Sequence, residues 1–424
     1  MNEQTQAFIR SHREDDVRRL ALKGAGASDV DLPLALQQIA GWQTARHKLP
    51  TWAAVEGVIY PPHLNMEQCS SEQTARYKAS LLSSPSTLHL PPSTLHLPPS
   101  TLHLQPSTYI DLTGGFGVDF YFMSQAFSRR IYVEQQEQLC DIARHNFSAL
   151  GLECSVVCGN AADILQQTDH ADCIFLDPAR RDDHGGRTYA LEDCTPNVLE
   201  LRDQLLQKAD CVILKLSPML DWHKAVEDLQ AVCEVHIVSV QNECKELLLV
   251  LGARGEEQGA RGMLHCVNLL SDGTIQHFDA PLLSPPLGGS PEAQKASPNG
   301  GRFGGGFLYE PNASIMKAGC FAALEQQYAV SQLSSNSHLF VSEEMVADFP
   351  GRGFRVEALT SFNKRELKVA LNGIEQANIT VRNFPMSVAE LRRKLHLKDG
   401  GEVFIFATTL SDGSRMLFIC RKIV

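Results

Sequence analysis

The chain of 424 residues is 43% hydrophobic and 21% charged with a formal net charge of −11, an ordinary globular composition with room for roughly two to four domains. This excess of acidic residues argues against a protein that coats nucleic acids in general. No run of about 18 apolar residues predicts a membrane span, and the polar first 19 residues lack the apolar core of a secretory signal. The twelve cysteines have no CxxC spacing, so we expect a cytoplasmic protein with core thiols, no metal site and no membrane partner.

The first 83 residues predict a helical region. Apolar residues recur at three- and four-residue spacing over 15–22 and 32–42, and a serine-capped helix begins near Ser70. Three near-identical heptads at 85–105 follow, and their prolines predict an exposed extended loop over 84–107. Their histidines recur only because the unit recurs, so they do not predict a metal site.

Strands alternate with helices over 108–255, which predicts a doubly wound, Rossmann-like α/β sheet of seven strands. The last two strands are joined by only 241–245, a connection too short for a parallel crossover. The seventh strand is therefore expected to be antiparallel. The predicted strands are 109–112, 130–134, 154–158, 173–177, 212–216, 235–240 and 246–251.

The C-terminal part predicts small α+β domains. A Gly/Pro/Ser-rich loop at 285–306 lies within the first of them, residues 256–345, and the second covers 346–424. From residue 348 onward there are 13 Lys and Arg against 8 Asp and Glu, a net charge of +5. This basic module is compatible with a local polyanion contact, but composition alone favours the alternative, a solvated helix face.

The run 109–119 predicts a strand, a carboxylate, a glycine-rich turn and a helix start. Glycine permits positive φ and close approach of backbone N–H groups to a ligand. Asp111 before the turn would repel a pyrophosphate and suits a cationic or hydroxyl-rich group, which favours S-adenosylmethionine over a dinucleotide. The turn residues of this cofactor-binding prediction are Thr113, Gly114, Gly115 and Gly117.

Two further cofactor contacts are predicted at the ends of the next strands. Glu134 closes the second strand, where a carboxylate can accept both ribose hydroxyls; the alternative is a surface glutamate. Asn160, Ala161 and Asp163 follow the third strand, where Asp163 can accept from the adenine amine. Asn160 has the alternative role of a helix N-cap.

The fourth predicted strand ends in Asp177, Pro178, Ala179, Arg180 and Arg181. The proline stops the strand ladder, and Asp177 can receive hydrogen bonds from a planar substrate edge. We therefore predict Asp177, Pro178 and Arg180 as catalytic and Arg181 as substrate-binding. A dehydrogenase fingerprint requires no Asp-Pro here.

With these motifs the chain resembles the class I S-adenosylmethionine-dependent methyltransferases, and more narrowly those with a ferredoxin-like segment and a C-terminal THUMP-like domain. The resemblance implies cofactor binding at Asp111, the glycine turn, Glu134 and Asp163. It implies an RNA substrate more weakly, because THUMP domains bind RNA. The carrying segments are 67–71, 75–78, 111–119, 177–181, 215–221, 242–248 and 381–385.

Direct attack by a substrate nitrogen or oxygen on the methyl group is the favoured chemistry, with Asp177 orienting the nucleophile. Arg180 could stack on a base or bind phosphate. Methylation of a base carbon would need a cysteine nucleophile, for which Cys194 and Cys69 are the candidates, although no dedicated motif surrounds them.

Further substrate-binding residues are predicted around the crevice and in the C-terminal domain. Lys215, Ser217 and Asp221 follow the fifth strand, with a helix cap and a nearby ion pair as their alternative. Arg76 and Lys78 could lie over the cofactor. The predicted RNA phosphate contacts are Arg382, Arg392, Arg393, Lys394 and Lys398.

Other functions stay open at this point: a small-molecule methyltransferase, a nonenzymatic RNA-binding protein that retains the fold, and an NAD-dependent oxidoreductase. The sequence names neither the RNA, the nucleotide and the methylated atom nor the oligomeric state.

Overall fold

The computed structural model describes residues 1–24, 29–82, 107–180, 191–252, 262–282 and 306–423. The heptads, nearly all of the glycine-rich loop, and Arg181 lie outside these ranges. The chain divides into two compact units: unit 1 comprises 1–235 and 246–262, and unit 2 comprises 236–245 and 263–424. In the described residues, no helix has the length and apolar character needed to cross a membrane.

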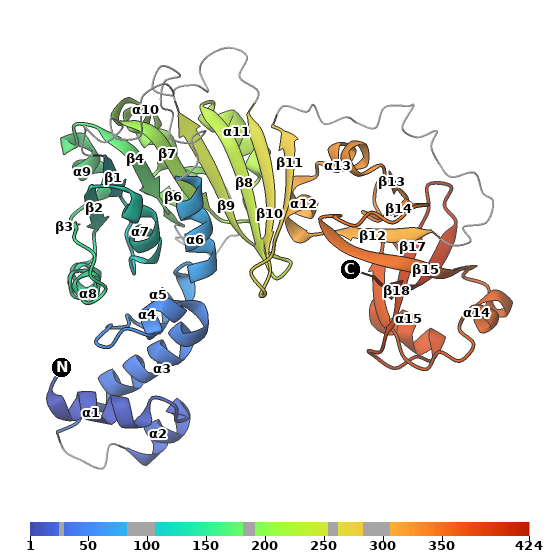
Figure 1. Ribbon diagram of the computed structural model, residues 1–424, viewed down its shortest axis with the longest axis horizontal. Helices are drawn as coiled ribbons and strands as arrows, with labels where there is room; N and C mark the ends of the chain where they lie inside the picture. Colours follow the sequence, from blue (N-terminus) through green and yellow to red (C-terminus); the bar gives the residue numbers. More distant parts are fainter. Residues whose placement is uncertain (25–28, 83–106, 181–190, 253–261, 283–305, 424) are drawn as a thin grey trace. The chain divides into compact units, whose positions relative to one another are not determined.

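Six helices form the N-terminal part of unit 1, as the apolar spacing predicts (Figure 1). Their starts follow local capping: the Asp31 side chain accepts from Leu34 N–H, and the Ser71 hydroxyl accepts from Thr74 N–H. They are α1 (Glu3–His12), α2 (Val17–Lys23), α3 (Leu32–Lys48), α4 (Pro50–Ala53), α5 (His63–Gln68) and α6 (Glu72–Leu81).

The main sheet has nine strands rather than the predicted seven, because the hairpin of β10 (Met263–Leu269) and β11 (Ile275–Pro281) extends it beyond β8. The hydrogen-bonded order is β11-β10-β8-β9-β7-β4-β1-β2-β3. The prediction of an antiparallel last strand is confirmed, since β9 pairs antiparallel with β7. The other strands are β1 (Thr108–Asp111), β2 (Arg129–Glu134), β3 (Ser155–Cys158), β4 (Ala171–Leu176), β7 (Ala209–Leu216), β8 (Val232–Val240) and β9 (Glu243–Gly252).

Strands β1, β2, β3, β4 and β7 run parallel, so their carboxyl ends meet at one edge of the sheet. The helix before β7 begins at Val198, because the Asn197 side chain caps it by accepting from Leu199 N–H. The helices are α7 (Val118–Met123), α8 (Glu137–Ala149), α9 (Ala161–Gln167), α10 (Val198–Lys208) and α11 (Trp222–Leu229), with 3-10 turns η3 (Ser124–Ala126) and η4 (Leu191–Asp193) and the short pair β5 (Ala179–Arg180) and β6 (Cys194–Thr195).

An aromatic core joins the N-terminal helices to this sheet within unit 1. Trp52 of the helical region packs against Phe116 with ring centroids 4.9 Å apart. Behind the glycine turn, Phe120 contacts both Tyr132 and Phe147. All five rings are buried, so the N-terminal helices share one core with the sheet that carries the motifs.

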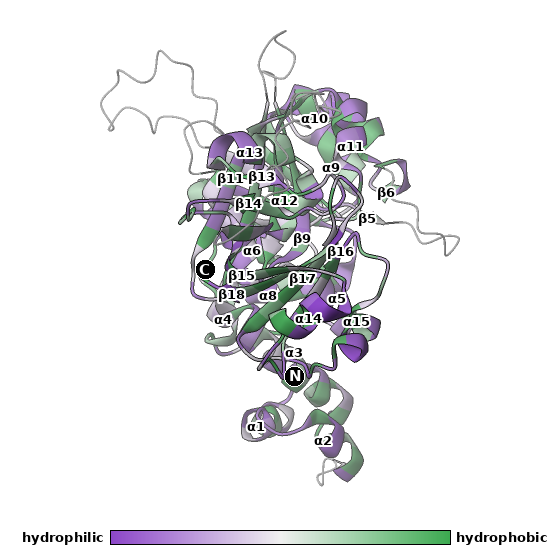
Figure 2. Cartoon of the chain, turned by 90° about the vertical axis from the view of Figure 1, so that its right-hand side faces the viewer, coloured by the Kyte–Doolittle hydropathy of each residue, from purple (hydrophilic) through white to green (hydrophobic). Residues whose placement is uncertain are grey.

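Unit 2 holds a second, seven-stranded sheet in the order β13-β14-β12-β15-β18-β17-β16. In Figure 2 its strands β15 and β17 are coloured green as apolar, whereas α15 is largely purple. Helices α12 and α13 are separated at Gly319, whose φ of 71° ends α12. The elements are β12 (Phe307–Pro311), α12 (Ala313–Ala318), α13 (Phe321–Tyr328), β13 (Ser331–Gln332), β14 (Phe340–Ser342), β15 (Gly351–Ser361), α14 (Lys364–Ala370), β16 (Asn378–Arg382), α15 (Val388–Leu395), β17 (Val403–Thr409) and β18 (Arg415–Lys422).

Candidate active site

The glycine turn lies between β1 and α7. A Cβ at Gly114 would fall 2.1 Å from the Tyr132 ring, and Gly117 has a φ of 89° and faces Phe147. Two of the turn's N–H groups are used within the turn or by the sheet: Gly114 donates to the Val133 carbonyl, and Gly117 to the Gly114 carbonyl. The glycines therefore serve first to fit this turn against the aromatic core.

Glu134 is buried at the end of β2 rather than exposed on the surface. Its carboxylate accepts from Gly115 N–H at 3.0 Å and from Gln136 N–H at 2.9 Å. Each oxygen keeps lone pairs for a further donor. The second strand therefore presents a fixed acceptor beside the glycine turn.

Asp111 and Asp177 lie at the ends of neighbouring strands and are linked through Thr113. Asp111 Oδ1 accepts from Thr113 N–H at 2.9 Å, and the Thr113 hydroxyl oxygen accepts from Asp177 N–H at 2.6 Å. The Pro178 that follows is buried. Thr113 thus fixes the backbone at the point where β4 ends.

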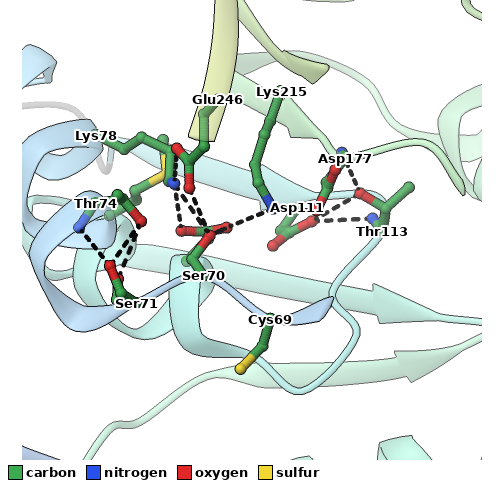
Figure 3. Close-up of polar contacts among 12 residues, drawn as sticks. Cys69, Ser70, Ser71, Thr74, Lys78, Asp111, Thr113, Asp177, Lys215 and Glu246 are labelled. Atoms are coloured by element: carbon green, nitrogen blue, oxygen red, sulfur yellow. Dashed lines mark hydrogen bonds and ion pairs between the residues drawn. The ribbon is translucent and has the colours of Figure 1, made fainter. Parts of the chain in front are cut away.

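A chain of alternating charges continues from Asp177 into the protein (Figure 3). The Lys215 ammonium, at the end of β7, donates to Asp177 Oδ2 and lies 3.7 Å from Asp119 Oδ2. Asp119 Oδ1 is 3.1 Å from Lys78 Nζ, and Lys78 Nζ is 2.5 Å from Glu246 Oε2 on β9. The Ser70 hydroxyl donates to Asp119 at 2.7 Å. We call the set Glu246, Lys78, Asp119, Lys215 and Asp177 the ion chain.

Burial and neighbouring charges compete in setting the pKa values of these acids. Burial raises the pKa of Asp177, although Lys215 opposes that rise. Burial also acts to raise the pKa of Asp119, but Lys78 and Lys215 outweigh it and hold that pKa below its usual value. Burial would lower the pKa of Lys215, yet Asp177 and Asp119 keep it raised. Neighbouring charges therefore stabilise the charged forms of Asp119 and Lys215, whereas burial dominates at Asp177 and disfavours its carboxylate.

Asp111 differs because, among the residues that the structure describes, no cation pairs with it directly. Burial raises its pKa well above the usual range despite the hydrogen bond from Thr113, and the carboxylates of Asp119 and Asp177 add to the rise. A cationic ligand beside Asp111 would relieve this repulsion.

Lys78 does not have the direct substrate contact that the sequence predicts. Its side chain is fully buried, and three acceptors surround its three N–H bonds: Ser70 Oγ, Asp119 and Glu246. Arg76, two residues earlier, turns to the other side, where it pairs with Glu72 at 2.7 Å and lies over the Phe122 ring. Both cations of α6 therefore hold structure.

Two helix N-termini account for several other predicted residues. The Asn160 side chain caps α9 by accepting from Ala162 N–H, and Asp221 caps α11 by accepting from His223 and Lys224 N–H. Asn160 and Asp221 therefore cap helices, which is the alternative role that the sequence offers for each of them. The Ser217 Oγ accepts from Met219 N–H. Asp163 is exposed in the first turn of α9, whereas Ala161 is buried. An open pocket beside Asn160 is lined by Ala162, Glu192, Thr195, Pro196, Asn197, Glu200 and Leu201.

Of the five predicted phosphate contacts, two are engaged inside unit 2, and Lys398 is exposed. Arg382 pairs at 2.7 Å with buried Glu310, and Arg392 pairs at 2.5 Å with Asp399 while donating to two carbonyl oxygens. Arg393 and Lys394 are exposed on α15, where Lys394 lies over the Phe362 ring. Composition alone does not reveal the acids that occupy Arg382 and Arg392.

The surroundings of Cys69 do not activate its thiol. Burial raises the pKa of Cys69, its thiol donates to the Met66 carbonyl, and Figure 3 shows it pointing away from Asp177. Cys194 is buried in β6. This favours a reaction without a cysteine nucleophile.

Three side chains of unit 2 are close enough to be considered for a metal ion: His265, His277 and Asp279. Their ring nitrogens lie 2.6 and 3.0 Å from the same Asp279 oxygen, and this contact raises the pKa of His277. In the described residues these three side chains therefore form a paired His–Asp cluster.

Sequence reasoning missed Ser70 and Glu246, and it gave Asp119 no role. Ser70 and Glu246 lie within segments that carry the family resemblance, and Asp119 closes the glycine run. Their place in these segments was the sequence signal that could have assigned these three residues a role. Nothing in it showed that Glu246 reaches Lys78 across 168 positions of sequence.

Comparison with known proteins agrees with this architecture. Residues 351–422 match the family model described as THUMP domain-like, and residues 307–350 match a ferredoxin-like domain model. A crystal structure described as a "putative methyltransferase from Porphyromonas gingivalis W83" is 29% identical with a TM-score of 0.78, covering 99% of this chain and 98% of its own. No curated protein matches the sequence.

Two other solved structures match part of the chain with TM-scores below 0.5. A SAM-dependent methyltransferase from Agrobacterium tumefaciens is 17% identical with a TM-score of 0.30 and covers 49% of this chain and 60% of its own. The human methyltransferase 10 domain containing protein is 13% identical with a TM-score of 0.35 and covers 51% of this chain and 95% of its own.

The fold is therefore a methyltransferase-like α/β fold with a large mixed sheet and a second, C-terminal sheet. Within it the chain carries a ferredoxin-like and a THUMP-like domain, which confirms the resemblance found in the sequence.

Proposed function

We propose that this protein is an S-adenosylmethionine-dependent methyltransferase that acts on RNA, either tRNA or rRNA. The observation that carries the proposal is the set of three carboxylates at the ends of parallel strands: Asp111, Glu134 and Asp177. Lys215 neutralises only one of them directly. The surplus of negative charge suits a sulfonium and repels a pyrophosphate.

The residues of this edge fit the cofactor's groups. Asp111 would hold the amine of its methionine part, and Glu134 the ribose hydroxyls. Asp163 would accept from the adenine amine, beside the pocket next to Asn160. S-adenosylmethionine, when bound, supplies an electrophilic methyl group. The likeness to the Porphyromonas gingivalis structure over nearly the whole chain supports this assignment.

The contribution of the protein to the reaction would be positioning and electrostatics. Asp177 accepts a hydrogen bond from the attacking nitrogen or oxygen and orients its lone pair. Lys215 holds the Asp177 carboxylate, while Thr113 and Pro178 fix its backbone. Arg180 and Arg181 follow directly in sequence and would contact the base or a phosphate.

RNA is the proposed substrate because the THUMP-like domain offers exposed cations. Lys364 and Arg365 on α14 and Arg393 and Lys394 on α15 are exposed. Cations of this kind bind phosphates without reading sequence.

Transfer of a labelled methyl group tests the proposal. The full chain is incubated with S-adenosylmethionine and RNA from cells lacking the gene, and the nucleosides are analysed by mass spectrometry. We expect one new methylated nucleoside, absent with Asp177→Asn. Label appearing only in a small-molecule fraction would contradict the RNA substrate and favour the small-molecule alternative. RNA binding by a protein that transfers no methyl group would favour the nonenzymatic alternative.

The role of α15 is tested with Arg393→Gln combined with Lys394→Gln. We expect weaker RNA binding and a shallower dependence on salt. Arg421→Gln is the control, because that guanidinium already pairs with Glu357 and Glu402. Equal losses in both variants would contradict a specific role of α15.

A further inference from the structure

We propose that Lys78 of α6, although it is buried away from substrate, is a positioning residue that sets the place and the charge of Asp177 through Asp119 and Lys215. The inference rests on the proposed function, because it assigns Asp177 its task there. It gives the N-terminal helical region a part in the reaction.

The first support is the fixed position of Lys78. Its side chain has no exposed surface, and Glu246, Asp119 and Ser70 accept at 2.5, 3.1 and 3.1 Å. A buried ammonium surrounded by three acceptors cannot turn away without leaving them unpaired. Figure 3 shows Lys78 and Lys215 reaching toward the same group of acids from opposite sides.

The second support is the sharing of Asp119 between the two lysines. Lys78 lies 3.1 Å from one Asp119 oxygen, and Lys215 lies 3.7 Å from the other. Lys215 therefore divides its charge between Asp119 and Asp177. If Lys78 is removed, Asp119 loses its closer cation and draws Lys215 away from Asp177.

The third support is the place of the unbalanced charge. The ion chain contains three carboxylates and two ammonium groups, so one negative charge is left over. The side chains of Asp177 and Lys215 are 38% and 11% exposed, whereas that of Lys78 is 0% exposed. The surplus charge is thus available at Asp177, the accessible end.

The charged groups that face Asp177 determine the direction in which each substitution shifts its ionisation. They are Lys215 on β7, Asp119 on α7, Asp111 on β1 and, beyond Asp119, Lys78 on α6. The lysines favour the ionised carboxylate, and the acids oppose it. Loss of Lys78 should move the ionisation of Asp177 to higher pH, and loss of Glu246 should move it to lower pH.

The experiment is a carboxyl ¹³C titration of the full chain labelled at aspartate, with the Asp177 signal assigned through Asp177→Asn. The main variant combines Lys78→Met with Glu246→Gln, which removes one charge of each sign from the buried pair. Glu246→Gln alone keeps Lys78 and supplies the shift of opposite sign, so the test does not depend on the double variant folding. Arg76→Met is the matched control, since it removes a cation from the same helix.

We expect an upward shift of about half a pH unit or more in the double variant, a downward shift with Glu246→Gln, and no shift with Arg76→Met. The acid limb of the rate of methyl transfer should move with the titration. An unmoved Asp177 midpoint in the folded variants, or an equal shift with Arg76→Met, would overturn the inference. The titration needs no cofactor, so a failure to bind S-adenosylmethionine would count separately, against the proposed function.

Discussion

The two units each bury a carboxylate against cations, but the clusters end differently. In unit 2, Glu310 is 4% exposed and both of its oxygens are occupied, one by Arg352 and the other by Arg382. In unit 1, the ion chain runs from buried Glu246 to partly exposed Asp177. The first cluster leaves one positive charge on its two partly exposed arginines, whereas the second carries a surplus negative charge to the sheet edge where open α/β folds bind ligands. The difference teaches that the sign and the position of the unbalanced charge together separate a candidate site from a structural ion cluster.

The largest effect is expected for Lys78→Met. The substitution leaves the buried carboxylates of Asp119 and Glu246 without their lysine partner. This should lower the free energy of unfolding of unit 1 by about 3–5 kcal/mol. Trp42, Trp52 and Trp222 are the only tryptophans and all lie in unit 1, so their fluorescence in urea reports its unfolding. Arg76→Met, which removes a half-exposed partner of Glu72, should cost at most about 1 kcal/mol. Equal losses would contradict a special role for the ion chain.

Asp177→Asn should lower the rate of methyl transfer about 10²- to 10⁴-fold while leaving cofactor affinity nearly unchanged. The amide keeps the shape of the carboxylate but loses its charge and part of its acceptor capacity. Single-turnover transfer and calorimetry separate the two effects. Full activity in this variant would show that the surplus charge has no part in the reaction.

Glu310→Gln should weaken only unit 2. The two arginines are 43% and 35% exposed, so solvent can take over their charge, and the expected cost is about 1–3 kcal/mol. Hydrogen exchange of β12 and β15 should rise, while tryptophan fluorescence and methyl transfer stay unchanged. Loss of methyl transfer would show that the Glu310 cluster is not merely structural.

The smallest effect is expected for Asp279→Asn, and it should depend on pH. Despite the opposing effect of burial, His265 and His277 lower the pKa of Asp279, so its contribution is present above about pH 4 and lost as pH falls through the lowered value. The raised pKa of His277 makes its contribution present below about pH 6.5 and lost as pH rises through the raised value. Thermal melting should therefore show a loss of at most about 1 kcal/mol near pH 5 and less at pH 8.5. A loss that does not vary with pH would contradict this charge pairing.

Local signals in the sequence predicted much of the fold and the nucleus of the site. The glycine turn, Asp111 and Glu134 were predictable because they follow short apolar strands within one run of chain. The partner of Lys78 could not be predicted because Glu246 lies 168 positions away, and that of Arg382 could not because Glu310 lies 72 positions away. Pairing over such separations is decided by tertiary packing, between α6 and β9 in the first case and within one sheet in the second, which periodicity does not encode. The two additional strands β10 and β11 were missed because the segment 256–345 was assigned as a whole to a linker domain.

Calorimetric titration of the full chain with S-adenosylmethionine, with NAD in parallel, tests the central claim most directly. The account predicts one site for S-adenosylmethionine, weakened by Glu134→Gln, and no heat with NAD. A folded protein that binds NAD, or that binds neither compound, would contradict it.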